Sequence, residues 1–125
     1  MSNGLSILLI SGEHERAHYA FALAAGAAAL GRRCLIFATN RGCLALAQDW
    51  SGLDHADRDE TLRARGLAGL AELRAACLEL DVRLLACDAG LKSEAIPVAL
   101  LLPQVAVSGI AAFLAESADA QFLTL

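Results

Sequence analysis

The sequence contains few charged residues and no excess of basic ones. Among its 125 residues, Lys and Arg together number 10 and Asp and Glu number 14, so the formal net charge is -4. Charged residues make up 19% of the chain, below the roughly 25% that is typical of soluble domains. Because a nucleic-acid groove needs a clustered basic surface, this balance argues against a nucleic-acid partner.

Several motifs that carry familiar chemistry are also missing. No GxGxxG motif or P-loop follows the first apolar segment, which leaves tight binding of nucleotide phosphates without support. The chain has no GxSxG motif and no legible Ser-His-Asp arrangement. It also has no CxxC pair, so a zinc ribbon or a thioredoxin-type dithiol is not expected. We therefore expect neither a metal nor a cofactor.

The sequence offers no clear targeting or membrane-spanning segment. Residues 1–4 lead into an apolar run without the basic stretch of a secretory signal. The uncharged segment 95–115 is long enough to cross a bilayer, but Pro97, Pro103 and Gly109 interrupt it. We expect a cytoplasmic protein that does not enter a membrane, with its four cysteines as free thiols.

Apolar residues, by contrast, are abundant. They make up 57% of the chain, against roughly 45–50% in typical domains. A chain this apolar can offset the entropy cost of ordering its backbone, which excludes disorder. The length predicts one domain over residues 1–125. Because a small domain has a limited interior, some of the apolar surface is expected to meet another subunit, which predicts a homo-oligomer.

Short apolar runs alternate along the chain with longer helical segments. Strands are predicted at 5–10, 34–38, 82–86, 105–107 and 121–125, and helices at 14–30, 59–80 and 110–117, with one or two helical turns at 43–47. Asp57 and Glu60 resemble a capping pair at the start of the long second helix. Strands that are apolar throughout belong to a sheet covered on both faces, and alternation with helices indicates parallel crossovers. The pattern predicts a three-layer α/β domain with about five parallel strands.

The end of the third predicted strand is the sharpest candidate for a functional site. Ligands of open parallel sheets bind beyond the carboxyl ends of the strands. Cys87 directly follows a buried strand, and a helical turn is predicted to begin at residues 89–92. Unpaired main-chain N–H groups at that turn, together with Lys92, would favour the thiolate, whereas Asp88 would oppose it. The position is equally compatible with a buried cysteine that only packs.

Three other strand ends should lie at the same edge of the sheet. They contribute the candidate binding residues Ser11 and Gly12, Asn40, and Ser108, to which we add Gly90, Lys92 and Arg16. Arg16 is predicted either to be surface charge or to hold an anion or a partner's carboxylate. The two explanations stay open from the sequence.

The remaining cysteines and the histidines receive structural interpretations. Cys34 and Cys77 are predicted to pack in the core. Cys43 is a weaker candidate for a second thiol at the same rim. His14 and His18 share a helix face but lack the further ligands of a metal site, so a solvated or capping role is favoured.

Several segments, in this order, resemble the DsrE/DsrF-like proteins, a family of small sulfur-relay proteins also labelled peroxiredoxin-related. Residues 15–31 resemble the family's first helix, residues 34–39 its second strand, and residues 42–44 the turn that follows. Residues 72–87 resemble the segment that ends in an Ala-Cys pair, with Cys87 at the family's cysteine. Residues 105–114, with sequence VAVSGIAAFL, resemble the family's V-E-V-x-G-V-A-T-(F/Y)-L element, and residues 119–125 its last strand. The turn after Cys87 differs, because Ala89-Gly90 stands where the family has a pair with a hydroxyl.

The resemblance implies a flavodoxin-like parallel sheet and homo-oligomers, often trimers or hexamers. It also implies a role for Cys87 as a carrier of persulfide sulfur between a donor protein and an acceptor protein, that is, as a sulfurtransferase. Two alternatives remain. The chain can be a non-catalytic oligomeric module that binds a small ligand or a partner, or a thiol redox protein that uses Cys87 and Cys43.

Overall fold

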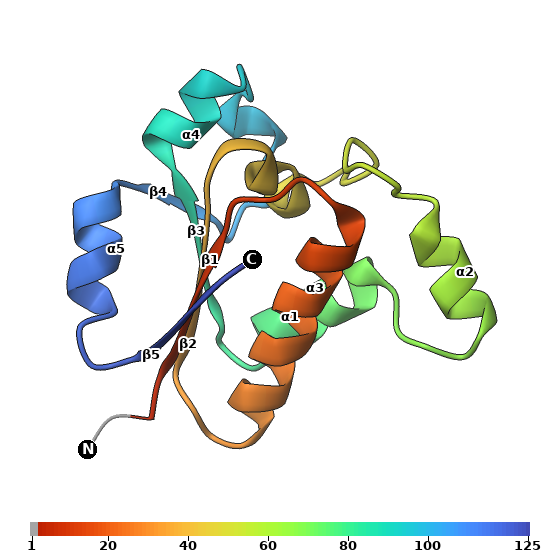
Figure 1. The fold of residues 1–125 in the computed structure, drawn as a ribbon, viewed down its shortest axis with the longest axis horizontal. Coiled ribbons are helices and arrows are strands. Elements are labelled where there is room, and N and C mark those ends of the chain that lie inside the picture. Colours follow the sequence, from red (N-terminus) through yellow and green to blue (C-terminus); the bar gives the residue numbers. More distant parts are fainter. Residues whose placement is uncertain (1–2) are drawn as a thin grey trace.

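The structure is a computed structural model and describes residues 3–125. Five strands form one sheet: β1 (Leu5–Leu9), β2 (Cys34–Ala38), β3 (Arg83–Cys87), β4 (Ala106–Ser108) and β5 (Gln121–Thr124). The helices are α1 (His14–Ala29), α2 (Arg58–Ala64), α3 (Leu70–Glu79), α4 (Asp88–Ser93) and α5 (Ile110–Glu116), with 3-10 turns η1 (Asn40–Leu46) and η2 (Val98–Leu100). Figure 1 shows their arrangement. Among residues 3–125, no helix combines the length and the apolar character needed to cross a membrane.

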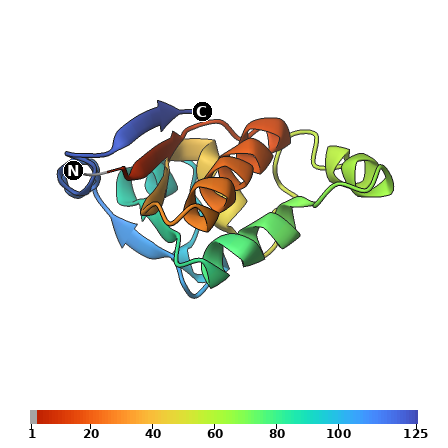
Figure 2. The ribbon, with the colours of Figure 1, turned by 90° about the horizontal axis from the view of Figure 1, so that it is seen from below.

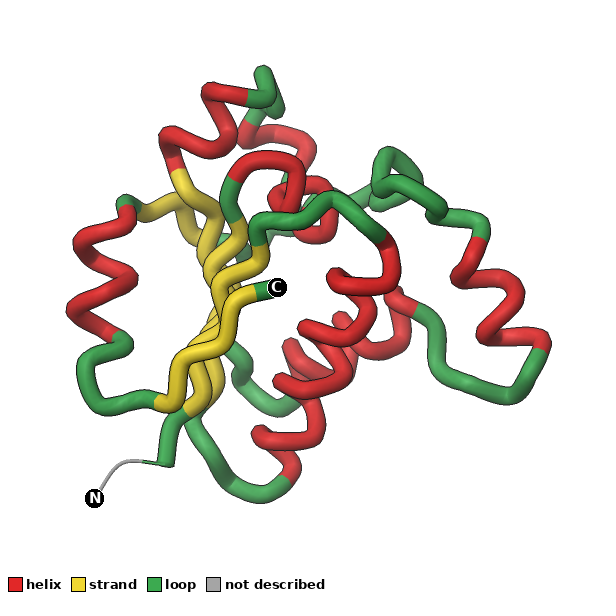
Figure 3. The backbone as a smooth tube through the Cα atoms, in the orientation of Figure 1, coloured by secondary structure: helices red, strands yellow, loops and turns green. Residues whose placement is uncertain are grey.

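The sheet has the order β4-β3-β2-β1-β5, and all of its neighbouring strands are parallel. This confirms the predicted α/β class, the five parallel strands and the flavodoxin-like layering. From β1 to β4 the chain moves across the sheet in one direction, and then it returns to the opposite edge at β5. Because such crossovers are right-handed, the returning helix α5 lies on the other face from α1 and α3, as Figures 1 and 3 show.

The two faces of the sheet are covered very unequally. On one face, α1 and α3 enclose a large core with Ile7, Leu9 and Ile36 of the strands. On the other face, α5 alone covers a small cluster, in which the Phe37 and Phe113 rings stack 4.5 Å apart. The view from below in Figure 2 shows the same layers, with α2 projecting beyond the body of the domain. One short helix cannot cover a whole sheet face, and Ile110, Leu114 and Phe122 stay exposed.

The single helix predicted over 59–80 is wrong, because the chain forms α2 and α3 there. Gly66 has a φ of +82°, and the N–H of Leu67 bonds to the carbonyl of Leu62, so α2 ends in a Schellman motif. The second helix starts after Gly69, whose N–H donates to the Glu72 carboxylate over 3.1 Å. The capping pair expected from Asp57 and Glu60 is likewise not formed, since no side-chain cap bond is present at Asp57. The break between α2 and α3 was not predicted because apolar residues recur at helical spacing on both sides of it.

Candidate functional site

Cys87 is the last residue of β3 and the N-cap of α4. Its backbone is extended (φ -72°, ψ 123°), and its Sγ accepts a hydrogen bond from the N–H of Gly90 over 3.4 Å. Residues 84–86 are buried core positions, and the chain turns directly from them into α4. The sulfur therefore occupies the strand-end, helix-start position that the sequence predicts, and it receives one of the free N–H groups of the helix.

The Cys87 side chain is less accessible than expected. Alternation along β3 turns Leu85 and Cys87 toward the α5 face, where they pack with Phe37 and Phe113. The residue is 7% exposed. The same alternation that places Cys87 beyond the core of α1 and α3 buries it in the smaller cluster under α5, as in the packing alternative that the sequence left open.

The first turn of α4 fits closely against the end of β2. A Cβ atom at Gly90 would collide with the main-chain nitrogen of Asn40 and with the hydroxyl of Thr39. Ser93 Oγ lies 2.9 Å from the carbonyl oxygen of Gly90 and 3.2 Å from Oδ1 of Asn40. Gly90 and Asn40 are therefore brought together beside Cys87, as the sequence predicted for two neighbouring strand ends. Thr39 and Ser93 join them.

Neither Thr39 nor Ser93 was identified as a site residue from the sequence. Thr39 follows β2 directly, so the strand-end rule that selected Asn40 also applies to it. Its hydroxyl approaches Gly90 from a neighbouring strand, although the turn after Cys87 itself carries none at 89–90. Ser93, the last residue of α4, had no comparable signal.

Ser108 completes this part of the rim from the other side. It is the last residue of β4 and lies opposite Cys87 in the parallel register of β3 and β4. The residue is partly exposed, and its hydroxyl makes no bond to Cys87 among the hydrogen bonds of residues 3–125. Ser108 thus shares the edge of the sheet with the thiol without contacting it through a hydrogen bond.

Lys92 does not act on the thiol as expected. Its Nζ lies 3.1 Å from Oδ2 of Asp88, one helical turn away, and both side chains are largely exposed. Since each of these charges is balanced by the other in water, neither exerts a strong field on Cys87. The two residues are four apart in one helix, a spacing that brings their side chains together.

Ser11 and Gly12 lie at the end of β1 and belong to a separate group of contacts. Ser11 Oγ accepts a hydrogen bond from the N–H of Glu13 over 3.0 Å. The carbonyl of Gly12 accepts from the N–H of Asp54, and Asp54 pairs with Arg41 at 2.8 Å. These contacts attach the loop before α2 to the carboxyl edge of the sheet. Ser11 and Gly12 therefore stabilise the fold at this edge.

Arg16 lies away from Cys87. It is exposed on α1 and lines an open groove with Tyr19 of the same helix and with Leu67, which follows α2. It forms no ion pair among residues 3–125. The exposed and unpaired Arg16 agrees with the surface-charge alternative, and no hydrogen bond or ion pair within residues 3–125 joins it to Cys87.

Cys43 is not positioned as a second thiol. It is fully buried in the core on the α1 and α3 face, where its Sγ donates to the carbonyl of Ala38 over 3.4 Å. Burial raises the pKa of the Cys43 thiol to about 11, although the nearby N–H of Cys87 favours the anion. Cys87 faces the opposite side of the sheet, in the cluster under α5. The Cys43 thiol therefore lies near the main chain of Cys87, but the two cysteine side chains pack in different core clusters.

The other two cysteines are core residues, as predicted. Burial raises the pKa of Cys34, and it raises the pKa of Cys77 to about 12. Cys77 lies on the inner face of α3 and its thiol donates to the carbonyl of Phe21 over 3.4 Å. Neither thiol lies at the carboxyl edge of the sheet.

The solvated or capping role expected of the helix histidines is wrong for His14. Its ring is completely buried, Nε2 lies 2.7 Å from Oδ1 of Asp59, and Nδ1 has no partner among residues 3–125. The His18 ring stacks on it at 5.6 Å, and His18 Nε2 donates to the carbonyl of Ala68. These histidines join α1 to the segment around α2. No group of three His, Cys, Asp or Glu suited to a metal is found in the described part of the chain.

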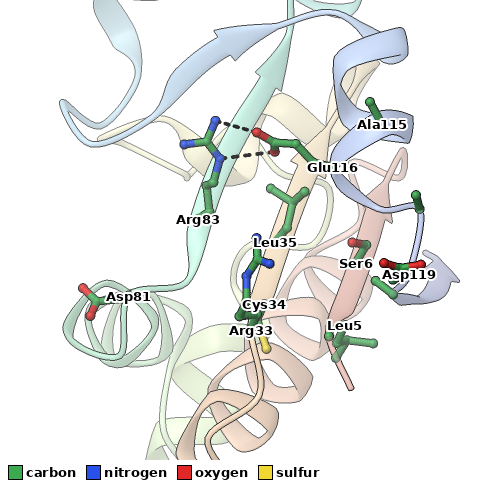
Figure 4. A pocket seen from close by; sticks show the side chains of 13 residues that line it. Leu5, Ser6, Arg33, Cys34, Leu35, Asp81, Arg83, Ala115, Glu116 and Asp119 are labelled. Atoms are coloured by element: carbon green, nitrogen blue, oxygen red, sulfur yellow. Dashed lines mark hydrogen bonds and ion pairs between the residues drawn. The ribbon is translucent and has the colours of Figure 1, made fainter. Parts of the chain in front are cut away.

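A cavity lies at the other end of the sheet, where the strands begin (Figure 4). Its volume is about 290 Å³, and it is lined by residues that include Ser6, Leu35 and Arg83 of the strands and Glu116 of α5. The hollow and the thiol therefore occupy opposite ends of the sheet.

Comparison with known proteins shows similarity in structure alone. No protein-family model matches the chain, and no curated protein matches it in sequence. The crystal structure of the YchN protein from E. coli superposes with a TM-score of 0.68 at 10% identity, over 98% of this chain and 99% of that one. MTH1491 from Methanobacterium thermoautotrophicum, a protein of unknown function, gives a TM-score of 0.55 at 17% identity, over 98% and 100%. At such identities the likeness shows that this chain shares the fold of these two proteins.

Proposed function

We propose that the protein is a sulfur carrier of the DsrE-like type, which passes persulfide sulfur through Cys87. The observation that carries the proposal is the hydrogen bond from the N–H of Gly90 to Sγ of Cys87 at the carboxyl edge of the sheet. A donor aimed at sulfur stabilises a thiolate more than a thiol, and the thiolate is the nucleophile. The proposal is also supported by the sequence segments that resemble, in the same order, those of the sulfur-relay family.

The reaction consists of two thiol exchanges and needs no outside oxidant. The Cys87 thiolate attacks the outer sulfur of a donor persulfide, R–S–SH. The S–S bond of the donor breaks, R–S⁻ leaves, and Cys87–S–SH forms with the proton retained. An acceptor thiolate then attacks the outer sulfur of Cys87–S–SH, which restores the Cys87 thiolate and leaves the acceptor as the persulfide. The chain itself supplies the nucleophile, its position and the N–H donor.

The small exposed fraction of Cys87 suits a carrier of a terminal sulfur. Adding one sulfur extends the side chain by roughly 2 Å, the length of an S–S bond. Because the residue Cys87 is only 7% exposed, its persulfide would then present only the outer sulfur atom to a partner. The apolar neighbours Phe37 and Phe113 would protect the inner S–S bond from water.

We also propose that the protein functions as a homo-oligomer, with a trimer or hexamer favoured. Ile110 and Leu114 of α5 are 60% and 54% exposed, and Phe122 of β5 is 42% exposed on the same side of the sheet. Contiguous apolar residues of this kind are typical of surfaces that meet another chain. The sulfur donor and acceptor would be further protein partners of each subunit.

The alternative of a non-catalytic binding module is favoured by one observation, the near burial of Cys87 among apolar side chains. In that case a variant without the thiol keeps its full function. The redox alternative is less favoured, because Cys43 and Cys87 lie in different core clusters on opposite faces. A disulfide would have to join two thiols whose side chains pack in different clusters.

The test is a mass measurement on the intact chain after treatment with glutathione persulfide, a donor small enough not to need a docking surface. The wild type should gain the mass of one sulfur atom, which a reductant removes. Cys87→Ser should gain nothing, whereas the matched control Cys43→Ser should behave like the wild type. A wild type without added sulfur, or a Cys87→Ser variant that gains it equally, overturns the proposal.

A further inference from the structure

The cavity at the amino end of the sheet is built from segments far apart in the sequence. The first residues of β1, β2 and β3 form one side, and the end of α5 with the turn toward β5 forms the other. Ser6 and Leu35 lie at its base, and both are buried. Figure 4 shows Arg33 and Arg83 on the strand side of the view and Glu116 and Asp119 on the side of α5.

One of the charge pairs in this cavity is already complete. Arg83 donates through Nη2 and Nε to the two carboxylate oxygens of Glu116, over 2.9 and 3.3 Å. This fork-to-fork arrangement fixes the guanidinium and the carboxylate against each other. It joins the start of β3 to the end of α5 and forms one wall of the cavity.

Two further charges of opposite sign line the cavity without being paired. Arg33 and Asp119 both belong to its lining, yet within residues 3–125 neither forms an ion pair or a side-chain hydrogen bond. The two charged groups are thus more than 4.0 Å apart, the limit within which ion pairs are found. Both residues are exposed, so water solvates their charges in the free protein. A ligand that carries the two opposite charges can replace that water at both groups.

Charge balance decides between ligand classes. A multiply charged anion such as phosphate would meet Arg33 but also the carboxylates of Asp81, Glu116 and Asp119. A simple cation would meet both arginines. A carboxylate paired in two-point fashion with the Arg33 guanidinium, joined to an ammonium that faces Asp119, satisfies both unpaired groups. An apolar middle part would then rest on Leu35.

We propose that this cavity binds a small zwitterion, an amino acid or a short peptide with free ends, with its carboxylate on Arg33 and its ammonium on Asp119. The cavity is distinct from the sulfur site, because Arg83 and Cys87 stand at opposite ends of β3. At about 3.3 Å per residue, that strand separates the two sites by roughly 13 Å. The binding site therefore does not depend on the proposed sulfur transfer.

The experiment is a titration of the full chain with L-leucine, followed by the amide resonances of Ser6, Leu35 and Asp119. Two half-ligands are titrated beside it: isocaproate, which lacks the ammonium, and isoamylamine, which lacks the carboxylate. We expect saturable shifts with L-leucine and about tenfold weaker binding of each half-ligand, since each loses one charge-assisted pair. Inorganic phosphate should give no saturable shift at these residues.

Three variants test the assignment of the two ends. Arg33→Gln and Asp119→Asn should each weaken L-leucine binding by about tenfold, whereas Arg65→Gln, an exposed arginine beyond α2, should leave it unchanged. Cys87→Ser should also bind normally, which separates this outcome from that of the sulfur experiment. The proposal fails if L-leucine causes no saturable shift, if isocaproate or phosphate binds as tightly as L-leucine, or if Arg33→Gln binds like the wild type.

Discussion

The N–H of Gly90 points at Sγ of Cys87 across 3.4 Å, and the close fit of Gly90 against its neighbours keeps it there. Glycine is required at this position for space, since a Cβ would strike the Asn40 nitrogen and the Thr39 hydroxyl. The first turn of α4 therefore packs against the end of β2 at Gly90, the residue whose N–H donates to the sulfur of Cys87. Packing between two strand ends thus determines the surroundings of the thiol.

Gly90→Ala should destabilise the protein and should also disturb the hydrogen bond from residue 90 to the sulfur of Cys87. Because the new Cβ would meet main-chain atoms that cannot rotate away, we expect a loss of about 1–3 kcal/mol in the free energy of unfolding. The matched control is Gly26→Ala in α1, where a Cβ would meet nothing within 4 Å. That change should stabilise the protein by up to about 1 kcal/mol, since alanine favours a helix interior. Urea denaturation of both variants measures the difference, and equal effects would show that the fit is not tight.

The four cysteines should react with iodoacetamide in an order set by their burial. The pKa values of about 11 for Cys43 and about 12 for Cys77 leave almost no thiolate at neutral pH. We expect these two to be alkylated at least roughly tenfold more slowly than Cys87 in the native protein. Peptide mass mapping over time gives the order. In denaturant all four should react alike, and a native Cys43 that reacts as fast as Cys87 would contradict the burial of Cys43.

Asp59 should be among the carboxylates most important for stability. Its Oδ1 lies 2.7 Å from Nε2 of buried His14 and accepts the N–H of Leu70, the first residue of α3, also over 2.7 Å. Asp59→Ala leaves both groups buried and unpaired, so we expect a loss of about 2–4 kcal/mol.

The control for Asp59 is Asp57→Ala, two residues earlier and exposed, which should change stability by less than about 0.5 kcal/mol. Hydrogen exchange at the amide of Leu70 should also become faster in Asp59→Ala alone. If both variants unfold at the same denaturant concentration, the His14–Asp59 contact does not stabilise the junction of α1, α2 and α3.

The pair of His55 and Glu13 should make a small pH-dependent contribution. His55 Nδ1 lies 2.8 Å from Oε2 of Glu13, and this hydrogen bond, with the charge of Glu13, raises the pKa of His55 above its ordinary 6.5. A raised pKa in the folded state means that the stabilisation is fully present below pH 6.5 and is lost as the pH rises through the raised value.

The difference in Tm between the wild type and His55→Gln should therefore be largest below pH 6.5 and shrink as the solution becomes alkaline. An NMR titration of His55 in Glu13→Gln should show its pKa returning toward the ordinary value. A His55 that titrates identically with and without Glu13 would mean that the contact does not persist in solution.

The parallel sheet follows from sequence features that act locally. Uninterrupted apolar runs such as Cys34–Ala38 favour a strand covered on both faces, and the Ala-rich segment after His14 favours a helix whatever its surroundings. The break between α2 and α3 was missed because leucines recur at helical spacing on both sides of it. Gly66 and Gly69 ended the first helix and began the second, which apolar periodicity alone does not reveal.

The position of Cys87 at a strand end was predictable for the same local reason, because the end of an apolar run and the start of a helix are both visible in the sequence. Its partners were not. The packing of Gly90 against Asn40, and of His14 against Asp59, depends on contacts between segments at least 45 residues apart. Local patterns carry no information about such pairings.

The amino-acid order alone thus determined the class of fold, the number of parallel strands and the strand end that carries Cys87, since each arises from the apolar periodicity of one segment. Tertiary structure decided that Cys43 and Cys87 face opposite sides of the sheet, that Gly90 is wedged against Asn40, and that Arg33 and Asp119 share a cavity. Those relations exist only after strand order and the unequal covering of the two faces bring distant segments together.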